Sequence, residues 1–167
     1  MEAMLKALND QFAAEMYSSY LYLSMASDFA SKGLGGFANW MRVQSQEENV
    51  HAMMFFDFIL ERGGKVIPDA LEKPPSAWDS PSAAFAAALS HEKYITGRIN
   101  DLADLAIQSK DHATNAFLQW FITEQVEEES SARDVLDKLN IAQGGMLYSL
   151  DKELGLRVFT PPPAKAK

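Results

Sequence analysis

The chain has 167 residues, enough to bury one sizeable core, and its length requires no second domain. Its 23 acidic and 15 basic side chains give a net charge of −8, which disfavours nucleic acid and anionic membranes as partners. Cysteine is absent, so disulfides, thiolate metal sites and cysteine nucleophiles are excluded. We expect a cytoplasmic protein without an export signal or a membrane span.

The first half of the chain predicts two long amphipathic helices. Apolar residues recur in steps of three and four over residues 3–31 and again over residues 37–62. Glycines follow each run, and the link between the runs is short, so the two helices should form an antiparallel hairpin. The buried stripe of the first helix includes Glu15 and Tyr22.

The second helix carries a pair of residues with metal-ligand spacing. Glu48 and His51 lie three residues apart on its inward stripe, and Glu47 precedes them. An unpaired carboxylate in a dry core is prohibitively unfavourable, whereas a metal ion bound by carboxylate and imidazole removes that penalty. Glu-x-x-His motifs in the cores of helix bundles supply such sites.

Residues 63–79 contain glycine, proline and few periodic apolar residues. They predict a long connection without structure of its own, able to run the height of a bundle and make the next helix parallel to the previous one. Ser80 and Pro81 then form a helix start, with an N-cap followed by proline. Helices are predicted over residues 81–109 and 115–139.

The two helices of the second half also carry acids on their inward faces. Glu92 is the single charge on the stripe of the first, and Glu124, Gln125, Glu127 and Glu128 crowd one turn of the second. A lone buried acid is usually a satisfied core group, but several in one bundle are hard to explain without a bound cation. The other two histidines, His91 and His112, are expected at the surface.

A short fifth helix is predicted over residues 146–154, after a glycine pair. Leu150 and Leu154 lie four residues apart, so they should face one axis shared with copies of this helix in an assembly. Residues 1–155 should form one all-α domain, a four-helix bundle with a long crossover and the short fifth helix. Residues 156–167 form a tail that we expect to be disordered from residue 160.

The ligand candidates repeat at an interval of 77 residues. Each candidate in the first hairpin has a glutamate or glutamine at the corresponding position of the second. This repeat predicts a two-metal site on a pseudo-twofold axis, with unequal surroundings for the two ions. The pairs are Glu15 with Glu92, Glu47 with Glu124, Glu48 with Gln125, and His51 with Glu128.

Together these motifs resemble the ferritin family over essentially the whole chain, and they are most similar to the bacterial non-haem ferritins. The resemblance implies a ferritin-like four-helix bundle and a shell of twenty-four identical subunits. It also implies iron storage, in which a ferroxidase centre inside each bundle oxidises Fe(II) with dioxygen or hydrogen peroxide and passes ferric iron to a mineral core. Haem is not expected, because Asn49 stands where haem-binding relatives have methionine.

The resemblance also implies a role for each candidate residue. Glu48 would bridge the two irons, and Tyr22 matches a tyrosine that lies beside the centre, so Tyr22, Glu48 and His51 are the candidate catalytic residues. The first iron would be held by Glu15, Glu48 and His51. The second would be held by Glu48, Glu92 and Glu128, with Gln125 close by. Glu47, Glu124 and Glu127, with a share of Glu128, match a third iron site.

Ligand type supports iron independently of the resemblance. A carboxylate-rich site with one imidazole suits iron or manganese better than structural zinc. Two other classes remain open. One is a di-iron oxygenase or peroxidase with another substrate. The other is a metal-binding bundle without a storage function, a purely structural bundle or a miniature cage that protects DNA.

Overall fold

The computed structural model describes residues 2–142 and 146–161, and within those ranges it contains helices and no strand. The predicted all-α fold is confirmed. None of the described helices is both long enough and apolar enough to cross a membrane. The helices are α1 (Glu2–Ser31), α2 (Gly35–Glu61), α3 (Pro81–Gln108), α4 (His112–Ile141) and α5 (Met146–Leu154).

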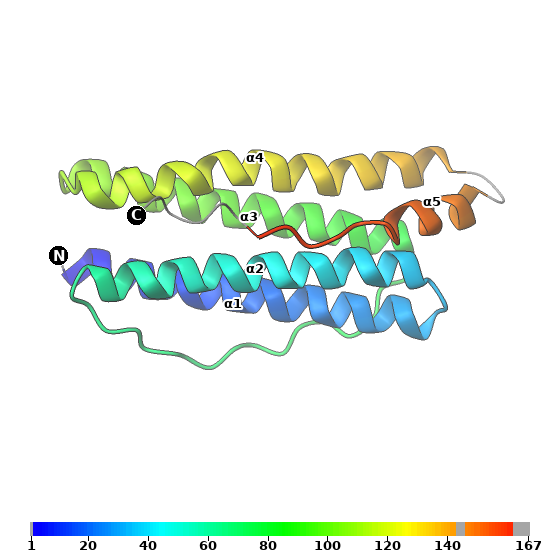
Figure 1. Ribbon diagram of the computed structural model, residues 1–167, viewed down its shortest axis with the longest axis horizontal. Helices are drawn as coiled ribbons and strands as arrows, with labels where there is room; N and C mark the ends of the chain where they lie inside the picture. The colour runs from blue at the N-terminus through cyan, green and yellow to red at the C-terminus, as the bar shows by residue number, and fades with distance from the viewer. Residues whose placement is uncertain (1, 143–145, 162–167) are drawn as a thin grey trace.

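The four long helices form two antiparallel hairpins that pack side by side (Figure 1). The connection after α2 runs the length of the bundle, so α2 and α3 are parallel, as the sequence predicts. Two side chains of α1 fix this crossover. Asn9 Oδ1 accepts a hydrogen bond of 2.8 Å from the Ile67 amide, and Ser24 Oγ donates one of 2.6 Å to the Pro75 carbonyl.

The observed helix ends differ from the predicted ones by three residues or fewer, and the largest shift is at the start of α4. This helix begins at His112 because Asp111 caps it, its Oδ1 accepting from the Thr114 amide at 3.2 Å. Arg62 Nη1 donates to the same oxygen at 2.8 Å, which holds the cap in place. At α3 the predicted cap is confirmed, since Ser80 Oγ accepts from the Ala83 amide.

Two apolar clusters fill the bundle, one on each side of a buried polar layer. One cluster contains Phe29, Phe37 and Phe85, and the other contains Phe55 and Phe121. On each long helix the residues of the two clusters are separated by about two to four turns, and most of the buried polar residues occupy those turns. The polar layer consists of Gln11, Glu15, Gln44, Glu48, His51, Glu92, Gln125 and Glu128.

The expectation that Leu150 and Leu154 face an axis between copies is wrong. Each is only 6% exposed within the single chain, because both pack into the cluster that contains Phe37. Their spacing predicted a shared face correctly, but it could not tell which surface covers that face. The α5 side chains that remain open to other molecules include Met146 and Tyr148, at 51% and 68% exposure.

Helix α5 also closes the N-terminus of α2. Asp151 Oδ1 accepts hydrogen bonds from the amides of Gly36 at 2.7 Å and Phe37 at 3.1 Å. The backbones approach so closely that a Cβ at Gly36 would collide with the Asp151 carbonyl oxygen. Glycine is therefore required at this position by contact rather than by backbone conformation.

Substituting Gly36 should loosen α5 from the bundle. Gly36→Ala should destabilise the chain by about 1–3 kcal/mol, the usual cost of overpacking, and lower its melting temperature accordingly. Gly35→Ala is the matched control, because a Cβ there has no neighbour within 4 Å. Thermal unfolding of both variants tests the contact, and equal melting temperatures would contradict it.

Candidate metal centre

Three buried side chains from the first hairpin form a ligand group. Glu15 on α1 and Glu48 and His51 on α2 each offer a ligand atom, and these atoms all lie within 4.8 Å of one another. Their exposures are 1%, 1% and 2%. Because the two helices of the hairpin pack directly against each other, the i, i+3 pair on α2 faces the carboxylate of α1, as the sequence predicts.

The aromatic residues of α4 set the position of the His51 ring. The ring packs edge-on against Trp120 and Phe121, with centroids 5.3 and 6.0 Å away. Its Nδ1 lies 3.4 Å from Glu48 Oε2. The packing restrains the imidazole and directs it into the polar layer.

Glu92 lies on the opposite side of this layer and is held by two neighbours. The Tyr22 hydroxyl donates to Glu92 Oε1, and Gln125 Nε2 donates to Glu92 Oε2 at 3.2 Å. Burial raises the pKa of Tyr22 well above its usual range, and the nearby charge of Glu92 adds to the shift. Tyr22 is therefore a protonated hydrogen-bond donor at neutral pH.

Two glutamines that the sequence analysis did not assign to the site support its carboxylates. Gln11 Nε2 donates to Glu15 Oε1 at 2.7 Å. Gln44 Nε2 donates to Glu48 Oε1 at 3.0 Å and to Glu128 Oε2 at 2.5 Å. Each glutamine stands four residues before the acid it contacts on its own helix, so the i, i+4 spacing was the signal that could have identified it.

Burial makes the charged form of these carboxyl groups unfavourable. Burial, together with the nearby charge of Glu48, raises the pKa values of Glu15 and Glu92 to about 8. The pKa of Glu48 lies well above its usual range for the same reason, with Glu128 as the main neighbouring charge. The layer therefore holds protons that a cation would have to displace.

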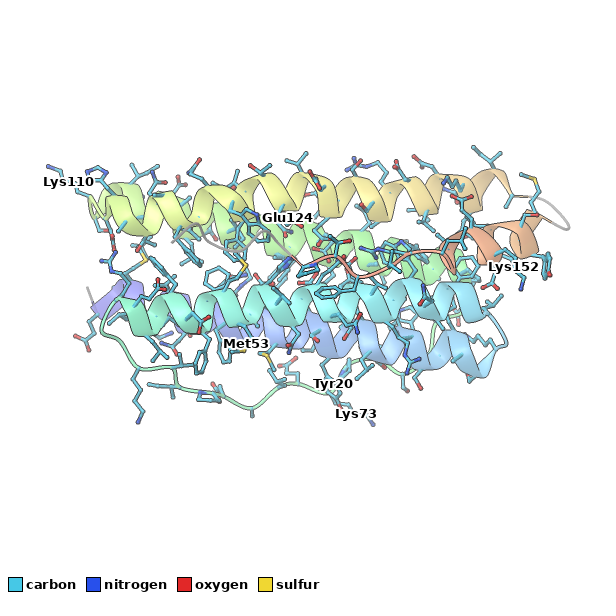
Figure 2. The ribbon with its side chains drawn as sticks, viewed as in Figure 1. Tyr20, Met53, Lys73, Lys110, Glu124 and Lys152 are labelled. Atoms are coloured by element: carbon cyan, nitrogen blue, oxygen red, sulfur yellow. The ribbon has the colours of Figure 1, made fainter. Side chains whose placement is uncertain are left out.

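The acids of α4 form a second possible ligand group with His51. Ligand atoms of His51, Glu124 and Glu128 lie within 4.8 Å of one another, and Figure 2 shows Glu124 on the side of α4 that faces α2. The predicted second set was Glu48, Glu92 and Glu128. All three are buried in the polar layer, but Glu92 turns its oxygens toward Tyr22 and Gln125, so these three do not form a compact ligand group of their own.

The three acids predicted for a third site have different surroundings. Glu47 Oε2 accepts a hydrogen bond of 2.5 Å from Arg157 Nη2, a contact that the sequence analysis missed. Glu124 is partly buried and contributes to the raised pKa of Glu47, so the two acids are close enough to interact. Glu127 is exposed on the next turn of α4.

The expectation that His91 lies at the surface is wrong, whereas His112 is exposed. His91 is partly buried between α1 and α3, with its Nε2 2.7 Å from Ser18 Oγ. Its ring contacts those of Tyr17 and Tyr22. Burial lowers the pKa of His91 to about 4, so the imidazole is neutral at physiological pH.

The buried layer fits a carboxylate-bound metal. Glu15 Oε2 and Gln44 Oε1 are buried, and neither accepts a hydrogen bond from a described residue. Buried polar atoms normally have partners, and a cation between the carboxylates would satisfy Glu15 Oε2 and offset the repulsion among the acids. Oxygen-rich ligation with one imidazole suits iron or manganese.

This fold and this layer define a four-helix bundle whose core carries a carboxylate and histidine group suited to binding metal. A family model described as "Ferritin-like domain" matches residues 5–142. The chain belongs to the ferritin family. The bacterial non-haem ferritin of Bacteroides fragilis (strain 638R) is 41% identical over 156 residues, which are 93% of this chain and 98% of that protein.

Other relatives confirm the similarity over nearly the full chain. The bacterial non-haem ferritin of Escherichia coli O157:H7 is 37% identical over 153 residues, covering 90% of this chain and 93% of that protein. The crystal structure of an open-pore ferritin from Archaeoglobus fulgidus is 57% identical, with a TM-score of 0.93 over 95% of this chain and 99% of that one. The predicted resemblance is confirmed.

The raised pKa values predict that the metal-free protein loses stability as the pH rises. Folding raises the pKa of Glu15 and Glu92 from 4.5 to about 8, so their stabilising contribution is complete below pH 4.5 and is lost as the pH passes through about 8. With a chelator present, the melting temperature should fall by several degrees between about pH 6 and about pH 8.5, since one kcal/mol corresponds to about 2–4 °C at this chain length.

Amide variants provide the control for this pH dependence. The double variant Glu15→Gln with Glu92→Gln does not titrate at these positions, so its melting temperature should vary less over the same pH interval. An equally steep fall in the double variant would show that the two carboxyls are not its source.

Proposed function

We propose that this chain stores iron, and that each subunit oxidises Fe(II) at the buried polar layer before ferric iron is deposited inside a shell of twenty-four copies. The observation that carries this proposal is the group formed by Glu15, Glu48 and His51, buried inside one subunit beside further carboxylates. Family membership supports the same conclusion. The cytoplasm is the proposed location.

The layer has the groups that this oxidation needs. Two Fe(II) ions give up one electron each, and one dioxygen molecule accepts both electrons and two protons to become hydrogen peroxide. Hydrogen peroxide is the alternative oxidant. The Glu48 carboxyl interacts with both Glu15 and Glu128, which supports its proposed role as the ligand that bridges two ions. His51 supplies the one nitrogen ligand.

Protons are the second part of the mechanism. The carboxyls with raised pKa values must release protons when Fe(II) binds, so binding should strengthen as the pH rises. Tyr22 keeps its own proton and directs it to Glu92. This hydrogen bond would orient Glu92, the proposed ligand, and would leave the oxidisable phenol of Tyr22 close to a second ion bound there.

The size of the assembly and the amount of iron that it retains together distinguish storage from the other classes. A di-iron oxygenase or a structural bundle requires no hollow shell, whereas storage requires an enclosed cavity. Anaerobic Fe(II) titration followed by oxygen exposure, with solution sizing and a count of retained iron per assembly, tests the proposal. Retention of no more iron than the ligand groups can hold would contradict storage.

Loss of a single ligand should stop rapid oxidation. His51→Ala and Glu92→Ala each remove a proposed ligand. His51→Ala also leaves a cavity beside Trp120 and Phe121, but the apolar clusters on both sides of the layer remain, so fold and assembly should persist. Removal of the buried acid in Glu92→Ala favours the metal-free state. Stopped-flow measurement of Fe(II) oxidation checks this. His112→Ala is the control because His112 is exposed, and wild-type rates in either ligand variant would contradict the assigned centre.

The third site should affect turnover rather than the first oxidation. Changing Glu47, Glu124 and Glu127 together to alanine should leave two ions binding and oxidising, but alter the ratio of iron to oxygen consumed and the rate of the second turnover. Carboxylates one helical step from the central ligands form an oxygen-rich environment that hard cations prefer. Glu129→Ala is the control, because Glu129 faces Thr96 and Arg133 instead.

Parallel oxygen-consumption and stopped-flow measurements separate the outcomes. An unchanged stoichiometry together with an unchanged second turnover in the triple variant would mean that these acids form no functional site. Loss of the first oxidation would instead show that they belong to the central pair.

A further inference from the structure

The chain beyond α5 forms a strap that returns along α2. Figure 1 shows residues 155–161 running back from α5 beside the bundle. Asn39 on α2 anchors the start of this strap, since its Nδ2 donates to the carbonyl oxygens of Leu154 at 3.3 Å and Arg157 at 2.9 Å. Together with the Asp151 cap, these bonds fix the position from which the Arg157 side chain extends.

The Arg157 side chain makes three contacts with α2. Its guanidinium lies 4.3 Å from the centre of the Trp40 ring, Nη1 donates to the Trp40 carbonyl at 3.3 Å, and Nη2 donates to Glu47 Oε2 at 2.5 Å. The side chains of Arg157 and Glu47 are 22% and 20% exposed, so both charges are largely removed from water. A stacked and hydrogen-bonded guanidinium is held more rigidly than a surface lysine.

Glu47 connects this cation with the metal layer. It directly precedes Glu48, and its carboxylate interacts electrostatically with His51 and Glu124. A metal ion that takes Glu47 as a ligand must therefore displace Arg157 or accept a positive charge beside it. Displacing Arg157 costs its contacts with Glu47 and Trp40. Keeping it in place leaves the guanidinium and the metal ion on the same carboxylate, where two positive charges repel strongly because water is partly excluded.

We propose that Arg157 is a tethered counter-cation that competes with metal ions for Glu47, so that the strap sets the affinity of the third site. This inference rests on the proposed function and adds a residue outside the ligand set that controls metal affinity. Ion binding and strap release are thermodynamically linked. An ion at the third site should therefore destabilise the docked strap by the same free energy by which the docked strap weakens ion binding.

The first test measures the binding of a redox-inert ion to the assembled, metal-free shell. In a calorimetric titration with Zn²⁺, the weakest class of sites in Arg157→Gln should bind about fivefold to tenfold more tightly than in the wild type. This factor is smaller than Coulomb's law alone would give, because Arg157 and Glu47 are partly exposed to water. Adding Glu47→Gln should abolish the gain. Arg133→Gln, which removes the same charge from a pair with Glu129, is the matched control and should match the wild type.

The second test follows the strap itself by hydrogen exchange. Saturating Zn²⁺ should accelerate exchange in a peptide that covers residues 150–159 of the wild type but not of Glu47→Gln. A purely structural role for Arg157 would lower the melting temperature of Arg157→Gln without changing its ion affinities, and that result would overturn the proposal.

These outcomes are distinct from failure of the proposed function. If the wild-type shell binds no ion at the layer that contains Glu15, Glu48 and His51, the metal centre itself is wrong. If that layer fills normally and Arg157→Gln binds as the wild type does, the centre is right and the strap has no control over it.

Discussion

The burial of several carboxyl groups in one layer of the bundle is the constraint on which the rest of the structure depends. Glu15, Glu48, Glu92 and Glu128 are each 5% exposed or less, and each repels the others when charged. The chain tolerates them because aliphatic and aromatic clusters on both sides supply the apolar burial that a core needs, while glutamines and Tyr22 donate hydrogen bonds within the layer. A layer of this kind reduces stability in exchange for cation affinity.

Much of the fold and part of the centre follow from local sequence patterns. The apolar period predicts the long helices, and Ser80 and the glycines predict where they begin or end. Glu15, Glu48 and His51 were identifiable because a helix converts spacing into direction, so residues on an apolar stripe must face the interior. The repeat of 77 residues extended the same reasoning to the second hairpin without knowledge of how the hairpins pack.

The remaining features depend on contacts between distant segments, which spacing cannot reveal. Leu150 and Leu154 share a face, yet only the packed bundle shows that their own subunit covers it. Glu47 and Arg157 are separated by 110 residues, and the strap that carries Arg157 has no periodic pattern that would predict their contact. The hydrogen bonds of Glu92 depend on rotamers, which are selected by Tyr22 and Gln125 across the core rather than by neighbours in the chain.

Helix α2 links the metal layer to the outer end of the bundle. It supplies Glu48 and His51. The same helix receives Asp151 at its N-terminus and Arg157 at Trp40 and at Glu47, which directly precedes Glu48. A cation bound by Glu47 would therefore act on the strap. The strap is continuous with α5, where Met146 and Tyr148 are exposed. Because α5 is short and is held to the bundle mainly through α2, the proposed competition for Glu47 would link occupancy of the third site to the seating of α5.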